Sequence, residues 1–483
     1  MLILLIFFIP LAAAFLSLLA PRGKKNWLEI GSLLASLGEM GVVFIIAKEV
    51  LISGNYPVFS IFEIDALSLL FIALISLVGF VAVMYSIGYL REEVKKEIIG
   101  FRRVRQYFVL LHLFIFAMLV AVCAHHPIVM WLAIEATTLS TAFLISFYGK
   151  PSTIEAAWKY LILNSVGLLL GFLGTLIFLV SANEAGGEHV FLDWQALRDA
   201  APFISSLAAK VGFVFVLIGY GTKVGLAPMH TWKPDAYDKA PVPIAALLSG
   251  VLLNVAFLSI LRFKAVVDDV LGSSFSSLLL IFFGIVSICV AMLLIFGQKN
   301  YKRLLAYSSI EHAGIMAIGF GIGGAAAFFA LLHMLYHALS KSLLFFAAGN
   351  IFLKYSSANI AKIKGAHSVL PITSLVFIGG ALGLLGLPPF GIFLTKFGIL
   401  ASAIEEYPIV AVFLVFALAL IFIGFLRHIS EMFFGVSPEG TQKGEANLWT
   451  LVPLLCLAAL FILLSLFMPS MLKTMLLDGA VLI

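Results

Sequence analysis

Residues 219–243 read GYGTKVGLAPMHTWKPDAYDKAPVP, and this stretch places a lysine and a helix break inside an apolar segment. Lys223 lies near the end of a long apolar run. Pro228, five residues later, removes a backbone donor and interrupts the helix. In lipid, a lysine at a helix centre costs about 3 kcal/mol, and a freed carbonyl needs a partner. Residues this costly are candidates for function, so the rest of the chain must supply partners for Lys223.

The composition surrounding this stretch is that of a membrane protein. Of the 483 residues, 62% are hydrophobic and 11% are charged, and the mean hydropathy is +1.13. Such a chain has no room for a sizeable aqueous domain. The net charge of +5 is modest and the basic residues are dispersed, which argues against nucleic-acid binding. We therefore expect a multi-pass protein of the cell membrane.

Apolar runs of roughly 18 residues or more predict an all-α, polytopic fold with about fourteen transmembrane helices. They lie near residues 1–20, 28–52, 64–88, 107–124, 127–148, 155–181, 203–226, 242–262, 276–296, 303–323, 325–353, 371–400, 408–434 and 449–470. Most lysines and arginines fall in loops on one side of this arrangement. Their distribution predicts that the loop Arg91–Arg105 is cytoplasmic.

An internal repeat is visible in the positions of the helix breaks. The seventh predicted helix ends in KVGLAPMHTW and the twelfth contains GLLGLPPFGIFLTKF, so each joins glycine and proline to a nearby lysine, Lys223 or Lys396. Gly-Pro kinks are common in membrane helices and often harmless, but two matched breaks favour inverted repeats with ion sites at discontinuous helices. We expect four parts, with two five-helix repeats in the middle: residues 1–106, 107–262, 276–434 and 449–483.

The fifth predicted helix, MWLAIEATTLSTAFLI, places Glu135 among apolar and small residues, where a carboxylate needs a cation. Lys223 is the obvious candidate. If the two groups meet, they form a switch, because a nearby carboxylate keeps the lysine protonated and its departure expels the proton. The alternative is a structural buried ion pair, which says little about function.

Further titratable residues follow on the tenth to twelfth predicted helices, and they resemble a proton relay. These residues are Glu311, His312, His333, His337, Lys341 and Lys396. His333, His337 and Lys341 recur every four residues and so share a helical face. The alternatives are a satisfied histidine, a Lys341 side chain that snorkels to the cytoplasmic edge, and a Glu311 that only bonds a neighbouring helix. Lys396 would end the line.

Metal and cofactor sites are not expected in this chain. His333 and His337 have the i, i+4 spacing of zinc ligands, but no glutamate lies between them and no third ligand is near. The three cysteines show no CxxC spacing, which argues against an iron–sulfur site. We expect His125 and His126 to form a solvated turn. We expect Asp235 to cap the helix that restarts after the break, or else to act where ions enter.

At these residues the chain resembles the antiporter-like membrane subunits of respiratory complex I, the Mrp cation/proton antiporters and energy-converting membrane-bound [NiFe] hydrogenases, and most closely the hydrogenase and formate-hydrogenlyase branch. The stretches that carry the resemblance are Glu135 and its surroundings, KYLILNSVG with Lys159, KVGLAPMHTWKPDAYDKAP, KRLLAYSSIEHAGIM, HALSKSLLF and GLPPFGIFLTKF. It implies fourteen helices, a Glu135–Lys223 pair, an axis through His333 and His337, and Lys396 as the terminal group.

One position departs from the family pattern. Many members have a lysine or histidine in the eighth helix, where this chain has Asn254. Asparagine can hold water but carries no proton at neutral pH, so the middle of the implied path runs through a residue that cannot titrate.

The resemblance predicts an ion-translocating subunit that moves H⁺, or exchanges it with Na⁺, and is not itself a catalyst. Its expected partners are other antiporter-like and small membrane subunits and a peripheral hydrogenase or complex I-like redox module, which would hold nickel–iron or iron–sulfur centres. The alternatives are a stand-alone secondary solute transporter and a scaffold that does not conduct.

Overall fold

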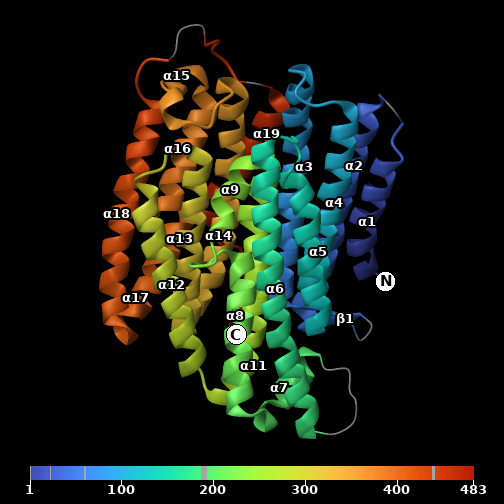
Figure 1. Ribbon diagram of the computed structural model, residues 1–483, viewed down its shortest axis with the longest axis vertical. Coiled ribbons are helices and arrows are strands. Elements are labelled where there is room, and N and C mark those ends of the chain that lie inside the picture. Colours follow the sequence, from blue (N-terminus) through green and yellow to red (C-terminus); the bar gives the residue numbers. More distant parts are fainter. Residues whose placement is uncertain (1, 22, 59–60, 187–192, 438–440, 446) are drawn as a thin grey trace.

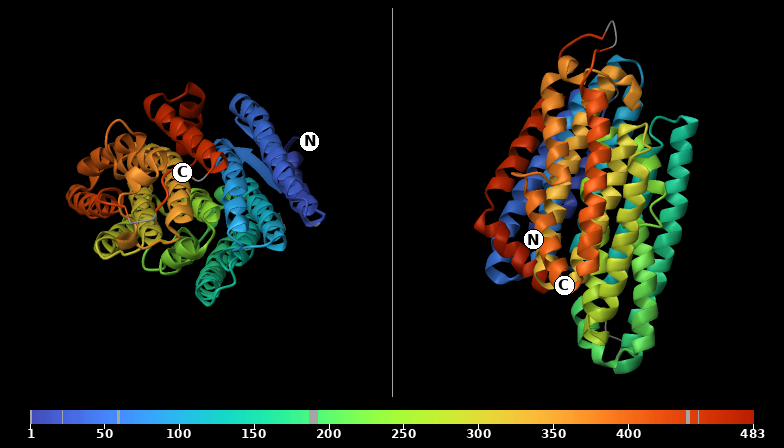
Figure 2. Two further views of the ribbon diagram at one scale, coloured as in Figure 1. Left: turned by 90° about the horizontal axis from the view of Figure 1, so that it is seen from above. Right: turned by 90° about the vertical axis from the view of Figure 1, so that its left-hand side faces the viewer.

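The computed structural model describes the chain except residues 1, 22, 59–60, 187–192, 438–440 and 446. The described chain is almost entirely helical. Long helices run side by side, with α1 and α2 at one edge of the molecule and α17 and α18 at the opposite edge (Figure 1). Seen from above, the blue N-terminal helices and the orange C-terminal helices lie on opposite sides (Figure 2, left).

The N-terminal part consists of three helices and a β-hairpin. Its elements are α1 (Leu2–Leu18), α2 (Lys25–Ser53), β1 (Asn55–Val58), β2 (Phe62–Asp65) and α3 (Ala66–Lys95). The two strands are antiparallel, with Asn55 opposite Asp65. Asp65 then begins α3, because its carboxylate accepts a hydrogen bond from the Ser68 amide at 2.8 Å.

The middle of the chain carries the first helix break. Its elements are α4 (Phe101–Cys123), α5 (Pro127–Ile145), α6 (Pro151–Gly186), α7 (Trp194–Asp199), η1 (Ala201–Phe203), α8 (Ser206–Val224), α9 (Trp232–Lys239), α10 (Val242–Leu247), η2 (Leu248–Leu252) and α11 (Leu253–Leu271). The η2 segment is a turn of π-helix that joins α10 to α11 in one buried span.

The last part carries the second break. Its elements are α12 (Ser274–Ile295), α13 (Tyr301–Ile322), α14 (Gly324–Tyr355), η3 (Ile360–Lys362), α15 (Ala366–Val369), α16 (Pro371–Leu385), α17 (Gly391–Glu406), α18 (Pro408–Phe433), α19 (Leu448–Leu466) and α20 (Ser470–Val481). α14 contacts helices from every part of the chain, including α3, α10, α13, α17 and α19. It is therefore central, and 89% of its apolar stretch is buried inside the bundle.

The polytopic all-α fold is confirmed. Among the described residues, 11 helices are long and apolar enough to cross a membrane. The other three predicted spans correspond to α1, to α13, and to α16 with α17. The chain is thus a multi-pass membrane protein.

Both predicted helix breaks are present, and their backbones begin in the same way. α8 and α16 each end at a glycine in the left-handed region, Gly225 with φ 80° and Gly386 with φ 87°. Glycine adopts this conformation without a Cβ penalty, which stops each helix inside the bundle. The chain then passes proline and restarts as α9 or α17.

Candidate functional site

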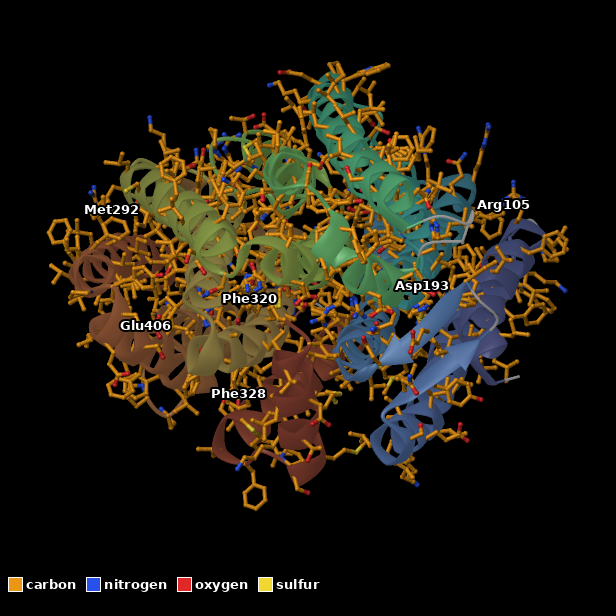
Figure 3. All side chains as sticks on the ribbon, turned by 90° about the horizontal axis from the view of Figure 1, so that it is seen from below. Arg105, Asp193, Met292, Phe320, Phe328 and Glu406 are labelled. Carbon is orange, nitrogen blue, oxygen red and sulfur yellow. The ribbon has the colours of Figure 1, made fainter. Side chains whose placement is uncertain are left out.

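A set of buried polar side chains occupies the interior between α5 and α17. Its members, apart from Glu135 and Lys396, are almost fully buried: Lys223, Lys233, Asn254, Glu311, His312, His333, His337 and Lys341. Side-chain nitrogen and oxygen atoms are visible between the ribbons as well as on the outer surface (Figure 3). Because lipid and apolar packing offer no solvation, each of these groups depends on the partners described below.

Lys223 and Glu135 do not form an ion pair in this structure. Lys223, at the end of α8 and 1% exposed, donates to the hydroxyls of Thr138 and Tyr160, both at 2.7 Å. One carboxylate oxygen of Glu135 accepts from Ser165 at 2.8 Å, and the other has no hydrogen-bond partner among the described residues. Thr138 lies one turn along α5 from Glu135. Lys223 is therefore bonded to a hydroxyl close to the carboxylate, and not to the carboxylate itself.

Tyr160 is the centre of the site around Lys223. Its hydroxyl lies 2.6 Å from that of Thr141, and the Lys223 ammonium lies 4.9 Å from the centre of its ring. Trp232, at the start of α9, packs edge-on against the same ring at 5.0 Å. The aromatic face stabilises the cation, and the hydroxyls offer it neutral oxygen atoms in place of a carboxylate.

The three predicted histidines, His312, His333 and His337, lie next to one another and form a chain of rings. Nδ1 of His312 lies 2.7 Å from Nε2 of His333, and Nδ1 of His333 lies 2.7 Å from the hydroxyl of Thr395. The rings of His312 and His337 are 5.2 Å apart. Both ring nitrogens of His337 are without a hydrogen-bond partner among the described residues. Three imidazoles from α13 and α14 therefore lead to α17, one residue from Lys396.

Lys396 pairs with Glu311, a contact that the sequence did not predict. The two side chains meet at 3.0 Å and are 10% and 1% exposed. The ammonium also lies 3.4 Å from the carbonyl of Leu385, the last residue of α16. The other carboxylate oxygen of Glu311 has no hydrogen-bond partner among the described residues. Lys396 therefore has the buried carboxylate partner that Lys223 lacks.

Lys341 does not snorkel to the membrane edge. It is fully buried, and its ammonium donates to the carbonyl of Leu305 at 2.8 Å and to the hydroxyl of Ser308. Because it shares a face of α14 with His333 and His337, it points into the bundle. The alternative of an interfacial lysine is therefore wrong.

Asn254 is buried beside the π-helical turn. Its amide donates to the carbonyls of Gly250 at 3.1 Å and Met334 at 3.3 Å, while its side-chain oxygen has no hydrogen-bond partner among the described residues. π-helical turns inside helices often mark functional sites. Here the turn presents backbone carbonyls and an amide, none of which can titrate.

Asp235 and Lys159 lie at the rim of the bundle. Asp235 does not cap α9, whose N-cap residue is Thr231. It is instead paired with Lys159 at 3.3 Å and with Arg303. Lys159, with 49% of its side chain exposed, also contacts Glu155 at 2.6 Å. These two predicted site residues are therefore apart from the buried set.

The His125–His126 turn is less solvated than expected, because both side chains have partners within the protein. His126 caps α5 by accepting from the Ile128 amide at 3.1 Å. His125 contacts Glu63 at 2.7 Å and Asp193 at 3.1 Å. Figure 3 labels Asp193 beside the β-hairpin. The two carboxylates raise the pKa of His125, with the hydrogen bond to Glu63 as the main cause, and the same hydrogen bond lowers the pKa of Glu63.

Sequence reasoning missed Lys233. It lies in the quoted stretch, five residues after Pro228. The structure buries it completely in the first break. The available signal was the break itself, because a lysine between two apolar helices of an intramembrane break has little access to water. Among the described residues, no group of three or more His, Cys, Asp and Glu side chains is placed to hold a metal ion.

A bundle with two discontinuous helices and titratable groups between them defines the class of ion-conducting membrane proteins. The family model described as NADH:quinone oxidoreductase/Mrp antiporter, TM, matches residues 124–423. A second model, NADH-Ubiquinone oxidoreductase (complex I), chain 5 N-terminus, matches residues 51–97. The chain belongs to the NADH:quinone oxidoreductase/Mrp antiporter family.

Individual proteins agree with this assignment. The chain is 37% identical to the Hydrogenase-4 component F homolog of Methylacidiphilum infernorum (isolate V4), over 88% of each chain. Its fold is similar to a subunit of the membrane-bound sulfane sulfur reductase, an archaeal respiratory membrane complex, with a TM-score of 0.87, 23% identity and coverage of 99% and 97%. It is also similar to a subunit of the Mrp complex from Dietzia sp. DQ12-45-1b, with a TM-score of 0.83, 19% identity and coverage of 99% and 96%.

Proposed function

We propose that this chain is the ion-translocating membrane subunit of a redox-driven complex in the cell membrane, either a membrane-bound hydrogenase or a related complex I-like assembly. It moves H⁺, or exchanges H⁺ with Na⁺, and does not catalyse the redox reaction. Its partners are other antiporter-like and small membrane subunits and a peripheral redox module, which holds the nickel–iron or iron–sulfur centres. The 37% identity with a hydrogenase-4 component F homologue favours this setting.

The observation that carries the proposal is the line of buried titratable groups between the two broken helices. The hydrogen-bonded cradle of Lys223 occupies one end. The imidazoles of His337, His312 and His333 follow, and the Glu311–Lys396 pair ends the line. Groups that can hold a proton are rare in membrane interiors because they are costly, so a set of them between two broken helices favours transport.

The repeat gives these residues their roles. In this proposal, residues 107–262 and 276–434 are two five-helix units, flanked by residues 1–106 and 449–483. Glu135 governs the charge on Lys223. The proton then passes along His337, His312 and His333, and Lys396 releases it. Moving one charge against 100 mV costs about 2.3 kcal/mol. A change of less than two pKa units at one lysine supplies that energy.

The test is redox-driven ion uptake by the purified complex in liposomes, with Lys223→Met as the variant. The matched control is Lys210→Met, because Lys210 lies on the same helix and is exposed. We expect uptake to fall at least ten-fold in Lys223→Met while electron transfer and assembly persist, and to stay at the wild-type level in the control. Undiminished uptake in Lys223→Met contradicts the proposed role. Separate measurements with and without Na⁺ distinguish H⁺ pumping from exchange.

A further inference from the structure

Lys233 is a buried lysine with few partners. Its ammonium donates to the carbonyl of Val224, the last residue of α8, at 2.6 Å. An ammonium has three protons to donate, and this carbonyl is its one hydrogen-bond acceptor among the described residues. A charge this deep is normally paired. Within the described chain, Lys233 has no carboxylate in an ion pair with it, unlike Lys396.

The surroundings of Lys233 repeat those of Lys396 at the second break. Lys233 contacts the final carbonyl of α8, and Lys396 contacts the final carbonyl of α16. The glycine that ends each helix makes room for the lysine: a Cβ added at Gly225 would lie 3.0 Å from Cδ of Lys233, and one added at Gly386 would lie 3.0 Å from Cδ of Lys396. Lys233, and not Lys223, is therefore the local equivalent of Lys396.

The residues next to Lys233 contact both the Lys223 site and the π-helical turn. Its neighbour Trp232 packs on Tyr160, which binds Lys223. The indole of Trp232 also donates to the carbonyl of Thr222 at 2.9 Å. The Lys233 ammonium lies 5.8 Å from the centre of the Tyr237 ring, and the Tyr237 hydroxyl donates to the carbonyl of Leu248 in the π-helical turn.

The segment that holds Lys233 also packs against α14, the helix of His337, because the rings of Tyr237 and Phe345 lie 5.8 Å apart. His337 is the free end of the histidine chain, with no hydrogen bond to either ring nitrogen from the described residues. Lys233 therefore lies in a segment that contacts both Tyr160, which binds Lys223, and the helix of His337.

We propose that Lys233 is a proton-carrying residue of the translocation path, which takes a proton from Lys223 and passes it to His337. The neutral amine of Lys233 accepts a proton from the Lys223 ammonium through the intervening hydroxyls or water. It then donates that proton to an imidazole nitrogen of His337, so that one proton moves and no electron does. Asn254 cannot perform this step, because an amide does not titrate near neutral pH. This inference rests on the proposed function.

Three substitutions separate this role from a structural one. Lys233→Met removes the proton site. Lys233→Arg keeps a cation that can bond the Val224 carbonyl, but arginine does not release its proton. Lys233→His keeps a group that titrates, at a lower pH than lysine. The matched control is Lys239→Met, on the same short helix but paired with Asp238 outside the line.

Proton uptake by the complex in liposomes is measured per assembled complex, between pH 6 and pH 9. We expect at least a ten-fold loss in Lys233→Met and in Lys233→Arg, normal uptake in Lys239→Met, and partial uptake in Lys233→His with its optimum shifted to lower pH. If Lys233→Met does not assemble, the arginine and histidine variants decide the matter.

Two results would overturn the inference. Wild-type uptake in Lys233→Met shows that the proton does not use this residue, and wild-type uptake in Lys233→Arg shows that only the bond to Val224 matters. Lys223→Met is measured in parallel. If it also transports normally, the proposed function itself fails. If it is inactive while Lys233→Met is active, only the role of Lys233 fails.

Discussion

The pair between Glu311 and Lys396 can be tested by its energetic coupling. The two charges lie 3.0 Å apart and are almost buried. At an effective dielectric constant of about 20, their attraction is about 5 kcal/mol, most of which offsets the cost of burying them. Removing one partner leaves the other charge unpaired, so Glu311→Gln and Lys396→Met should each destabilise the protein by about 3 kcal/mol.

A double-mutant cycle isolates the interaction. We expect the double variant to be destabilised by no more than either single variant, which corresponds to a coupling energy of about 3 kcal/mol. The assay is unfolding of the protein in mixed micelles as the fraction of denaturing detergent rises, for the wild type, both single variants and the double variant. Losses that add to within about 0.5 kcal/mol would refute the pair as a coupled unit.

Three further outcomes are expected. Lys341→Met should raise stability by about 1 kcal/mol, because it removes a buried cation that has no ion pair with any of the described residues, while lowering ion uptake at least ten-fold; unchanged uptake would contradict a role in the path. Protection of the β-hairpin from hydrogen exchange should fall as pH rises through the raised pKa of His125, and it should also fall as pH drops through the lowered pKa of Glu63. His125→Gln should remove the transition at higher pH. Gly219→Ala should cost about 1–3 kcal/mol in unfolding measurements, since its Cβ would lie 2.3 Å from a backbone nitrogen of α6, whereas Gly41→Ala meets open space and should not destabilise.

The sequence allowed the architecture to be predicted because lipid imposes simple rules on it. A run of apolar residues must form a helix whose length matches the bilayer, and glycine with proline must interrupt it. The positions of the fourteen spans and of both breaks followed from these two constraints. Buried titratable residues such as Lys223, His333 and Lys396 were found by the same reasoning, because each is costly inside an apolar run.

Side-chain partners could not be predicted in this way. A helical period tells which residues share a face, but not which residue of another helix meets them. Lys396 was therefore expected to end a line, when it also pairs with Glu311. Lys233 was missed for a different reason: the break has no helical period, so spacing does not tell whether its side chain points inward. Asp235 was misassigned there too, since its cationic partners Lys159 and Arg303 come from α6 and α13.

The two broken helices are not in the same electrostatic state. At one end Lys223 is bonded to hydroxyls, while Glu135 contacts Ser165; at the other, Lys396 contacts the carboxylate of Glu311. A buried positive charge is stabilised by a nearby carboxylate more than by neutral hydroxyls. In the arrangement described, Lys223 and Lys396 therefore differ in the kind of partner that each ammonium has. On the proposed path the two ends exchange these arrangements: Glu135 leaves Ser165 and approaches Lys223, while Lys396 separates from Glu311.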